Sequence, residues 1–214
     1  MWGSDTRRRG GGSGVAACLA LALVTAAGLG GQATASPERL AYLSEQGASS
    51  APLGWRQFCR DMPAECRTRP RSVEVIRTGG TAWATIIRVN AHVNTAIEPV
   101  TDIDQYGREE VWTYPTSGRG DCEDYVLLKK KLLVEAGLPE SALLVTVVRD
   151  RQGDGHAVLT VRTDRGDYVL DNETSDIRLW HQTGYRFVKR QSSVDPNLWV
   201  TVGPGSAPAS VATR

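Results

Sequence analysis

Histidine and cysteine are scarce in this chain, which has three of the first and four of the second among 214 residues. It contains no C-x-x-C or H-x-x-x-H pair, so a zinc site built from Cys and His is excluded. Neither sign of charge is in surplus, since 25 Lys and Arg face 24 Asp and Glu. A nucleic-acid partner is therefore not expected, because such binding needs an excess of basic side chains. With 41% hydrophobic residues the chain is not of the disordered class either.

Residues 1–35 have the layout of a secretory signal peptide. A basic run at Arg7–Arg9 precedes an apolar stretch from Val15 to Leu29, and Ala33-Thr34-Ala35 offers a small-residue cleavage site. An uncleaved anchor is the alternative, but the apolar stretch of roughly 15 residues is shorter than the about 20 that a membrane-spanning helix needs. We expect a periplasmic or secreted protein with no stable membrane insertion after cleavage.

Two of the cysteines that remain after cleavage, Cys59 and Cys66, lie close together in the sequence. In an oxidising compartment a disulfide between them is the favoured interpretation, and two free thiols are the alternative. Cys122 is then left without a cysteine partner.

The pattern of apolar residues changes along the chain from a helical period to strands. Apolar spacing predicts helices over 81–97 and 122–136, the second ended by Gly137 and Pro139. Valine-rich runs separated by turn residues then predict antiparallel strands. These runs cover 143–149, 156–162, 167–171 and 185–190.

The expected architecture is α+β, with N-terminal helices packed on an antiparallel sheet. Residues 36–54 are rich in Ala, Ser, Gly and Pro and are expected to form a flexible lead. The folded domain is predicted to cover 55–202, and 203–214 is expected to be a disordered tail.

Cys122 lies where a glycine-containing turn meets the start of a helix. The free N–H groups and the helix dipole favour a thiolate at this position, which predicts a low thiol pKa and a nucleophile. The alternative is a small buried core thiol, which the flanking carboxylates of Asp121, Glu123 and Asp124 disfavour.

A thiol nucleophile needs a base, and the base needs an orienting partner. If Asp164 and Arg165 form a two-residue turn, Thr163 pairs with Gly166, and His156 and Asp171 then fall on the same face of the hairpin. A shift of one residue in the pairing would put them on opposite faces. The sequence thus predicts a Cys122–His156–Asp171 triad.

The carboxylates around Cys122 have two interpretations. Asp121 is a candidate helix N-cap, with Asp124 completing a pair that resembles a capping box. Because carboxylates beside a thiolate raise its pKa, a hard cation such as Ca²⁺ bound by these oxygens is the other interpretation.

The motifs Gly120-Asp-Cys-Glu-Asp-Tyr125, Gly155-His-Ala-Val-Leu159 and Tyr168-Val-Leu-Asp-Asn172 resemble those of the bacterial transglutaminase-like cysteine proteinases. The resemblance covers roughly residues 52–200 and implies a papain-like or transglutaminase-like fold. It implies Cys122 as nucleophile, His156 as general base and acid and Asp171 as orienting residue. It also implies that Asp121 and Glu123 are Ca²⁺ ligands. That family includes a calcium-dependent periplasmic protease that clips a biofilm adhesin.

The expected activity is hydrolysis of a peptide bond in a protein substrate, which could be a cell-surface protein. The Cys122 N–H is a candidate oxyanion donor, and Trp112 is a candidate for the second. The alternatives are a transglutaminase or amidase acting on cell-wall peptide, and a catalytically inactive calcium- or peptide-binding module. The chain is short and carries a cysteine pair typical of a subgroup of this family. The adhesin substrate is therefore not carried over from the resemblance, and the substrate stays open.

Overall fold

The computed structural model describes residues 41–67 and 72–203. The predicted signal peptide, residues 36–40 of the predicted lead and residues 204–214 of the predicted tail lie outside the described residues. No helix among the described residues is long and apolar enough to cross a membrane.

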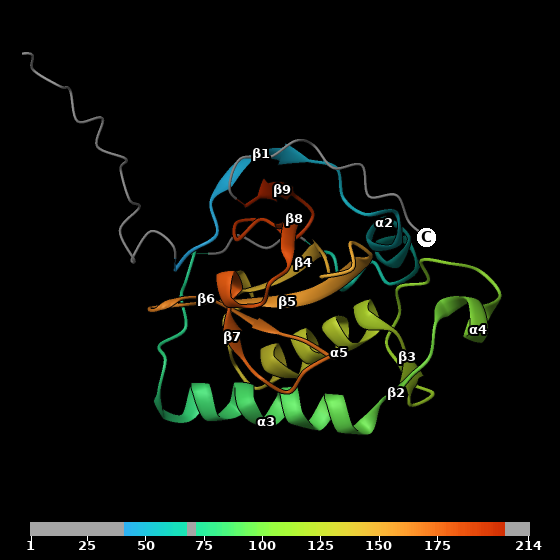
Figure 1. Ribbon diagram of the computed structural model, residues 1–214, viewed down its shortest axis with the longest axis horizontal. Helices are drawn as coiled ribbons and strands as arrows, with labels where there is room; N and C mark the ends of the chain where they lie inside the picture. The colour runs from blue at the N-terminus through green and yellow to red at the C-terminus, as the bar shows by residue number, and fades with distance from the viewer. Residues whose placement is uncertain (1–40, 68–71, 204–214) are drawn as a thin grey trace, which may run out of the picture. The chain divides into compact units, whose positions relative to one another are not determined.

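A seven-stranded sheet forms the centre of the domain (Figure 1). All of its neighbouring strands are antiparallel, in the order β1-β9-β8-β4-β5-β6-β7. The strands are β1 Glu45–Ser49, β4 Leu143–Arg149, β5 Gly155–Thr163, β6 Gly166–Leu170, β7 Arg178–Leu179, β8 Arg186–Gln191 and β9 Trp199–Val202. The expected α+β architecture with an antiparallel sheet is confirmed.

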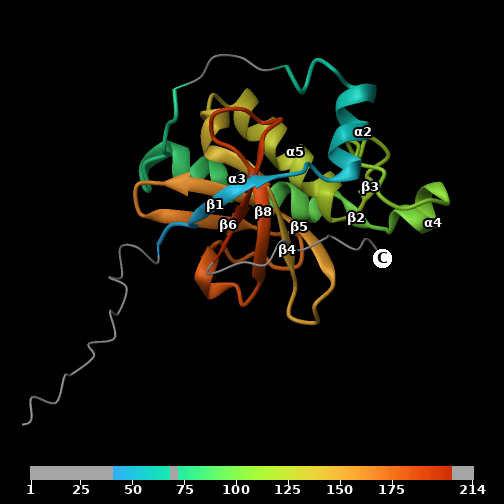
Figure 2. The ribbon, with the colours of Figure 1, turned by 90° about the horizontal axis from the view of Figure 1, so that it is seen from above.

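Helix α5 (Cys122–Glu135) packs against β4 and β5, and helix α3 (Gly80–Ala96) packs on the outer side of α5. Helices α2 (Leu53–Asp61) and α4 (Asp102–Tyr106) lie at the end of the sheet where α5 begins, as two views of the ribbon show (Figures 1 and 2). The short parallel pair of β2 (Glu98–Pro99) and β3 (Arg119–Gly120) lies at this same end. The described residues also include two single turns of 3₁₀ helix, η1 Glu140–Ala142 and η2 Trp180–Gln182.

Strand β4 is buried on both faces, which explains why its sequence is a continuous valine-rich run rather than an alternating one. On one face, side chains of β4 and β5 such as Val145 and Leu159 pack against Val126 and Leu133 of α5. On the other face a second apolar cluster forms, with the members Leu43, Val148, Val158, Val169, Phe187 and Val202. The sheet is therefore a rigid platform for α5.

The β5–β6 hairpin has the register that the sequence predicts. Thr163 pairs with Gly166 across the turn, and Leu159 pairs with Leu170. Gly166 has a φ of 127°, a conformation that side chains disfavour. Thr78 donates two hydrogen bonds of 2.8 Å to the Asp164 carboxylate, one from its amide and one from its hydroxyl, and so braces the turn from outside.

Residues 41–54 do not form the flexible lead that the sequence predicts. Residues 45–49 form β1, which pairs with β9, and Leu43 is buried in the second apolar cluster. β1 is an edge strand with little burial, and its residues are small or polar. Its sequence therefore lacks the alternation of apolar and polar residues that would predict a strand. The predicted Cys59–Cys66 disulfide is formed.

Candidate active site

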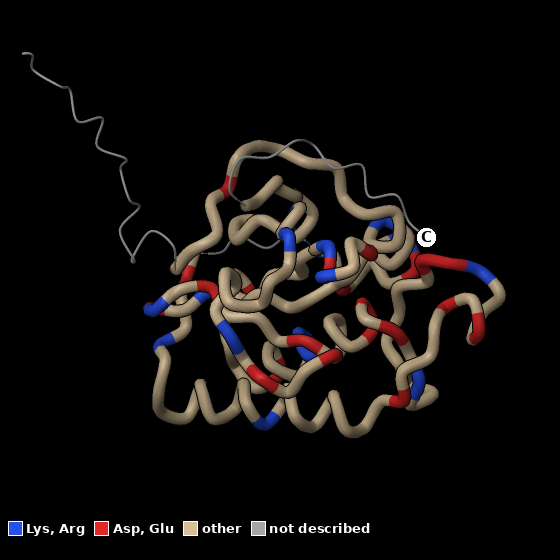
Figure 3. The backbone as a smooth tube through the Cα atoms, viewed as in Figure 1, with Lys and Arg blue, Asp and Glu red and all other residues tan. Residues whose placement is uncertain are grey.

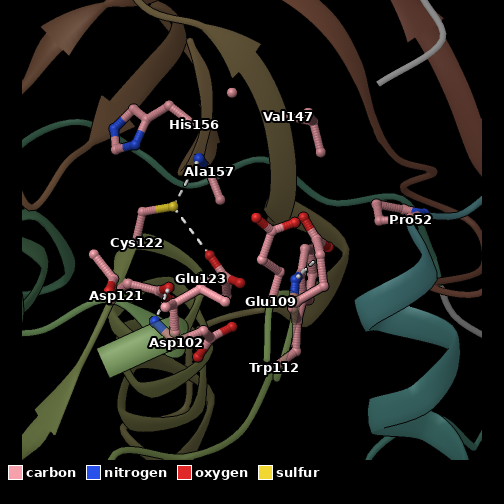
Figure 4. A pocket seen from close by; sticks show the side chains of 14 residues that line it. Pro52, Asp102, Glu109, Trp112, Asp121, Cys122, Glu123, Val147, His156 and Ala157 are labelled. Carbon is pink, nitrogen blue, oxygen red and sulfur yellow. Dashed lines mark hydrogen bonds between the residues drawn. The ribbon is translucent and has the colours of Figure 1, made fainter. Parts of the chain in front are cut away.

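Cys122 is the first residue of α5 and lines a cavity of about 340 Å³ (Figure 4). The cavity lies between the start of α5, the start of β5 and the loop around α4. The turn before the cysteine requires glycine, because a Cβ on Gly120 would lie 2.5 Å from an oxygen of Asp124. Besides Cys122 the lining includes Pro52, Asp102, Glu109, Glu110, Trp112, Asp121, Glu123, Val147, His156 and Ala157.

The hairpin brings His156 and Asp171 together. His156 Nε2 lies 2.9 Å from Asp171 Oδ1, and both side chains are buried. Burial alone would raise the pKa of Asp171, but hydrogen bonds from His156 and Tyr185 hold it below its ordinary value. Because an ionised carboxylate only accepts hydrogen bonds, Nε2 carries the proton and Nδ1 is left free to exchange one.

The Cys122 thiol lies between the start of α5 and the start of β5. Its Sγ accepts a hydrogen bond of 3.4 Å from the Ala157 amide and donates one of 3.0 Å to Glu123 Oε2 (Figure 4). Burial, followed by the charges of Glu123 and Asp121, raises the pKa of Cys122 well above its ordinary value. The low thiol pKa expected from the helix start is thus not favoured in this structure, because burial and the carboxylates outweigh the helix dipole.

Three carboxyl groups converge beside the thiol. Asp102, Asp121 and Glu123 each offer an oxygen, and these oxygens lie within 4.8 Å of one another. They belong to a wider acidic region, since residues 102–124 contain seven acidic and two basic side chains (Figure 3). Burial, followed by the charge of Asp102, raises the pKa of Asp121 to about 6.

The capping interpretation of Asp121 is not supported. Asp121 is at the N-cap position of α5, but its side chain makes no capping hydrogen bond. Its Oδ2 instead accepts a hydrogen bond of 3.3 Å from the amide of Asp102. The Asp124 carboxyl group interacts with the backbone N–H of Asp121, as in a capping box, and its Oδ1 also accepts a hydrogen bond of 2.9 Å from the amide of Thr113.

This carboxyl cluster fits a hard cation such as Ca²⁺. Asp121 Oδ1 is buried without a hydrogen-bond partner among the described residues, as expected for an oxygen that serves as a ligand. The cluster is made only of oxygen donors, which suit Ca²⁺. Sequence reasoning proposed Asp121 and Glu123 but missed Asp102, which lies 19 residues from Asp121 in the chain.

A second group of close ligand atoms comes from His156, Asp171 and Glu173. Hydrogen bonds explain why these groups lie close together, because the Tyr185 hydroxyl lies 2.6 Å from Asp171 Oδ2 and 3.1 Å from Glu173 Oε2. We therefore treat this group as a hydrogen-bond network. Sequence reasoning missed Tyr185.

The candidate second oxyanion donor is already hydrogen-bonded, and the two other histidines lie outside the cavity lining. Trp112 lines the cavity, but its indole N–H donates to Glu110 Oε2 at 3.2 Å, so it is not free to bind an oxyanion. His92 and His181 are exposed on α3 and η2.

Comparisons with known proteins identify the family of the chain and a similar fold. A family model described as "Bacterial transglutaminase-like cysteine proteinase BTLCP" matches residues 45–207. Calcium-bound LapG of Legionella pneumophila is 23% identical and has a TM-score of 0.50, with 63% of this chain and 77% of that chain covered. A second LapG structure, also 23% identical, has a TM-score of 0.49 and coverages of 58% and 71%. No curated protein sequence matches. The chain belongs to the bacterial transglutaminase-like cysteine proteinases, as the motifs around Cys122, His156 and Asp171 led us to expect.

Proposed function

We propose that this protein is an exported cysteine endopeptidase in which Cys122 attacks, His156 transfers protons and Asp171 orients His156. The observation that supports it most is the 2.9 Å contact between His156 Nε2 and Asp171, which leaves Nδ1 for the thiol proton. The cavity at Cys122 gives a substrate access to these groups.

The reaction begins when the thiol turns from Glu123 toward the ring and gives its proton to Nδ1. The sulfur then bonds to the carbonyl carbon of the scissile amide, and the backbone N–H of Cys122 at the free end of α5 is placed to stabilise the oxyanion. The C–N bond breaks as the imidazolium protonates the leaving amine. Water, deprotonated by His156, attacks the thioester and releases the acid and the thiol.

We further propose that Asp102, Asp121 and Glu123 hold Ca²⁺. A bound divalent cation supplies positive charge that offsets these carboxylates, which otherwise oppose formation of the thiolate. One of the similar structures is calcium-bound LapG of Legionella pneumophila, and this supports the assignment.

Export through residues 1–35 is also part of the proposal. The Cys59–Cys66 disulfide supports it, since such bonds persist in oxidising compartments. Cell fractionation and N-terminal sequencing of the purified protein test it, and a cytoplasmic protein that retains residues 1–35 would contradict it.

The central experiment compares the cells' own surface proteins in strains that carry the parent enzyme or Cys122→Ala. New N-termini of proteins released into the medium are labelled and sequenced, and we expect a set that needs Cys122. Identical sets in the two strains would overturn hydrolysis by Cys122. Isopeptide cross-links that need Cys122, without new N-termini, would favour transamidation.

A chemical probe gives a second test that needs no known substrate. A trans-epoxysuccinyl peptide reacts when the thiolate opens the epoxide and the alkoxide takes up a proton. We expect the parent protein to be labelled once, at Cys122, and Cys122→Ala not to be labelled. Equal labelling of both proteins would contradict the assignment.

A further inference from the structure

The Asp171 carboxylate is held at both of its oxygens. Oδ1 faces His156 Nε2 and also accepts a hydrogen bond of 3.1 Å from the Glu173 amide. Oδ2 accepts a hydrogen bond of 2.6 Å from the Tyr185 hydroxyl. A carboxylate fixed in this way cannot rotate without breaking a hydrogen bond, so its Oδ1 stays aimed at the imidazole.

Tyr185 also contacts the imidazole itself. The two rings meet edge to face, with centroids 5.6 Å apart and an angle of 77° between the planes. The backbone of Tyr185 is anchored as well, because its amide donates to Thr183 Oγ1 at 3.2 Å. One side chain thus touches both His156 and Asp171 and comes from the segment before β8, outside the hairpin that carries them.

We propose that Tyr185 is a positioning residue that keeps Asp171 and the His156 ring aligned for proton transfer. The inference rests on the proposed catalytic role of Cys122, His156 and Asp171. The hydroxyl fixes the carboxylate and the ring edge limits the tilt of the imidazole, so Nε2 stays protonated and Nδ1 stays available to take the thiol proton.

Glu173 competes for the same hydroxyl proton. Its Oε2 lies 3.1 Å from the hydroxyl oxygen, against 2.6 Å for Asp171, and a phenol has one proton to donate. The closer Asp171 is the stronger acceptor. Burial and the two carboxylates raise the pKa of Tyr185 above its ordinary value, so the hydroxyl remains a donor.

The test compares Tyr185→Phe, which removes only the hydroxyl, with the parent protein in reaction with the epoxysuccinyl peptide. We expect the maximal rate of Cys122 labelling to fall by about 10-fold, because misplacement of the proton-transfer group slows the chemical step. The probe concentration at half-maximal rate should change less than about 2-fold, since the hydroxyl is not a probe contact. Nitrogen-15 spectra of the His156 ring should show the Nε2-protonated tautomer in the parent and a mixture of tautomers in the variant.

The matched control is Tyr42→Phe, which removes a hydroxyl that donates to the Thr163 carbonyl at 3.1 Å, on the hairpin but outside the cavity lining. It should leave the labelling rate and the tautomer unchanged. A maximal rate of Tyr185→Phe within about 2-fold of the parent would overturn the positioning role while leaving the catalytic role of Cys122 intact. Labelling of Cys122→Ala would instead overturn the proposed function itself.

The second test variant is Glu173→Gln, which leaves Tyr185 itself unchanged. It should label at least as fast as the parent, because the hydroxyl is then committed to Asp171. A loss as large as that of Tyr185→Phe would assign the effect to the Glu173 carboxylate and would overturn the proposal.

Discussion

The Nζ of Lys129 lies 2.9 Å from the backbone carbonyl oxygen of Asp171, and both residues are buried. The same carbonyl accepts a hydrogen bond of 2.8 Å from Asn94 Nδ2 on α3. Lys129 follows Cys122 by two turns of α5. The helix that presents the thiol therefore also holds the residue after β6, which fixes the distance between the two.

Replacement of Lys129 by Met should change how stability depends on pH. Burial lowers the pKa of Lys129 to about 7, against about 10.4 in an unfolded chain. The folded state therefore binds fewer protons than the unfolded state between these values, so the lysine costs stability that is regained as pH rises from 7 to 10. The free energy of unfolding of Lys129→Met, relative to the parent, should rise by on the order of 4 kcal/mol as pH falls from about 10 to about 7.

Urea unfolding of Lys129→Met and the parent at a series of pH values measures this difference. If the free energies of unfolding of the two proteins change in parallel from pH 7 to pH 10, burial of the Lys129 amine does not cost the predicted stability. Lys131→Met on the same helix, whose amine lies over the Tyr114 ring, is the matched control in the same unfolding series.

Each of the three clustered carboxyl groups should be needed for Ca²⁺ binding. Asp102→Asn, Asp121→Asn and Glu123→Gln remove one charge each with little change in shape, and we expect each to weaken Ca²⁺ binding by about 10-fold or more. Isothermal titration calorimetry measures the affinity. Glu98→Gln is the control, because its exposed carboxylate lies outside the cluster and pairs with Arg119. Unaltered affinity in Asp102→Asn would remove that residue from the site.

Stabilisation of the protein by Ca²⁺ should depend on pH. In the metal-free protein burial raises the pKa of Asp121 to about 6 and that of Asp124 to about 8. A raised carboxyl pKa means that the fold favours the protonated form, so this contribution to stability is full at low pH and is lost as pH rises through 6 and 8. The melting temperature of the chelated protein should fall between about pH 5 and about pH 8.5.

Added Ca²⁺ should reverse that loss, and should raise the melting temperature more at pH 8 than at pH 5.5, because ligand oxygens must be deprotonated. Differential scanning fluorimetry with and without a chelator measures both trends. An equal gain from Ca²⁺ at the two pH values would argue against ligands with raised pKa values.

Gly54 on α2 should tolerate no side chain. A Cβ at this position would overlap Cδ1 of Trp112, which is buried beside the cavity. Gly54→Ala should therefore displace Trp112 and cost about 1–3 kcal/mol in the free energy of unfolding. Gly47→Ala is the control, since its Cβ would have only an atom of Thr201 at 4.0 Å within reach. Equal stability of the two variants by urea unfolding would show that α2 shifts freely.

Local patterns in the sequence were enough to predict most of the elements that carry the site. The strand over 143–149 agrees with β4 residue for residue, and the two main helices agree within one residue at each end. The contact between His156 and Asp171 was predictable because a two-residue turn fixes which strand residues face each other.

Other parts of the site depend on contacts between distant segments, which no local pattern reveals. Asp102 reaches the cluster because α4 folds back onto the start of α5, and Tyr185 reaches Asp171 from the approach to β8. The sequence indicates that the carboxylates beside Cys122 raise the pKa of its thiol, but not that burial, the larger cause, does so too, because burial arises from tertiary packing.

The turn at Asp164 and Arg165 separates Gly166 from Thr163 and lies at the far end of the hairpin from His156. Deletion or insertion of a single residue there would slide β6 by one position and carry Asp171 to the other side of the sheet. The length of this exposed turn, which lies outside the lining of the cavity, thus decides on which face of the sheet Asp171 lies. A variant with one residue fewer in this turn would keep both strands and lose the contact between His156 and Asp171.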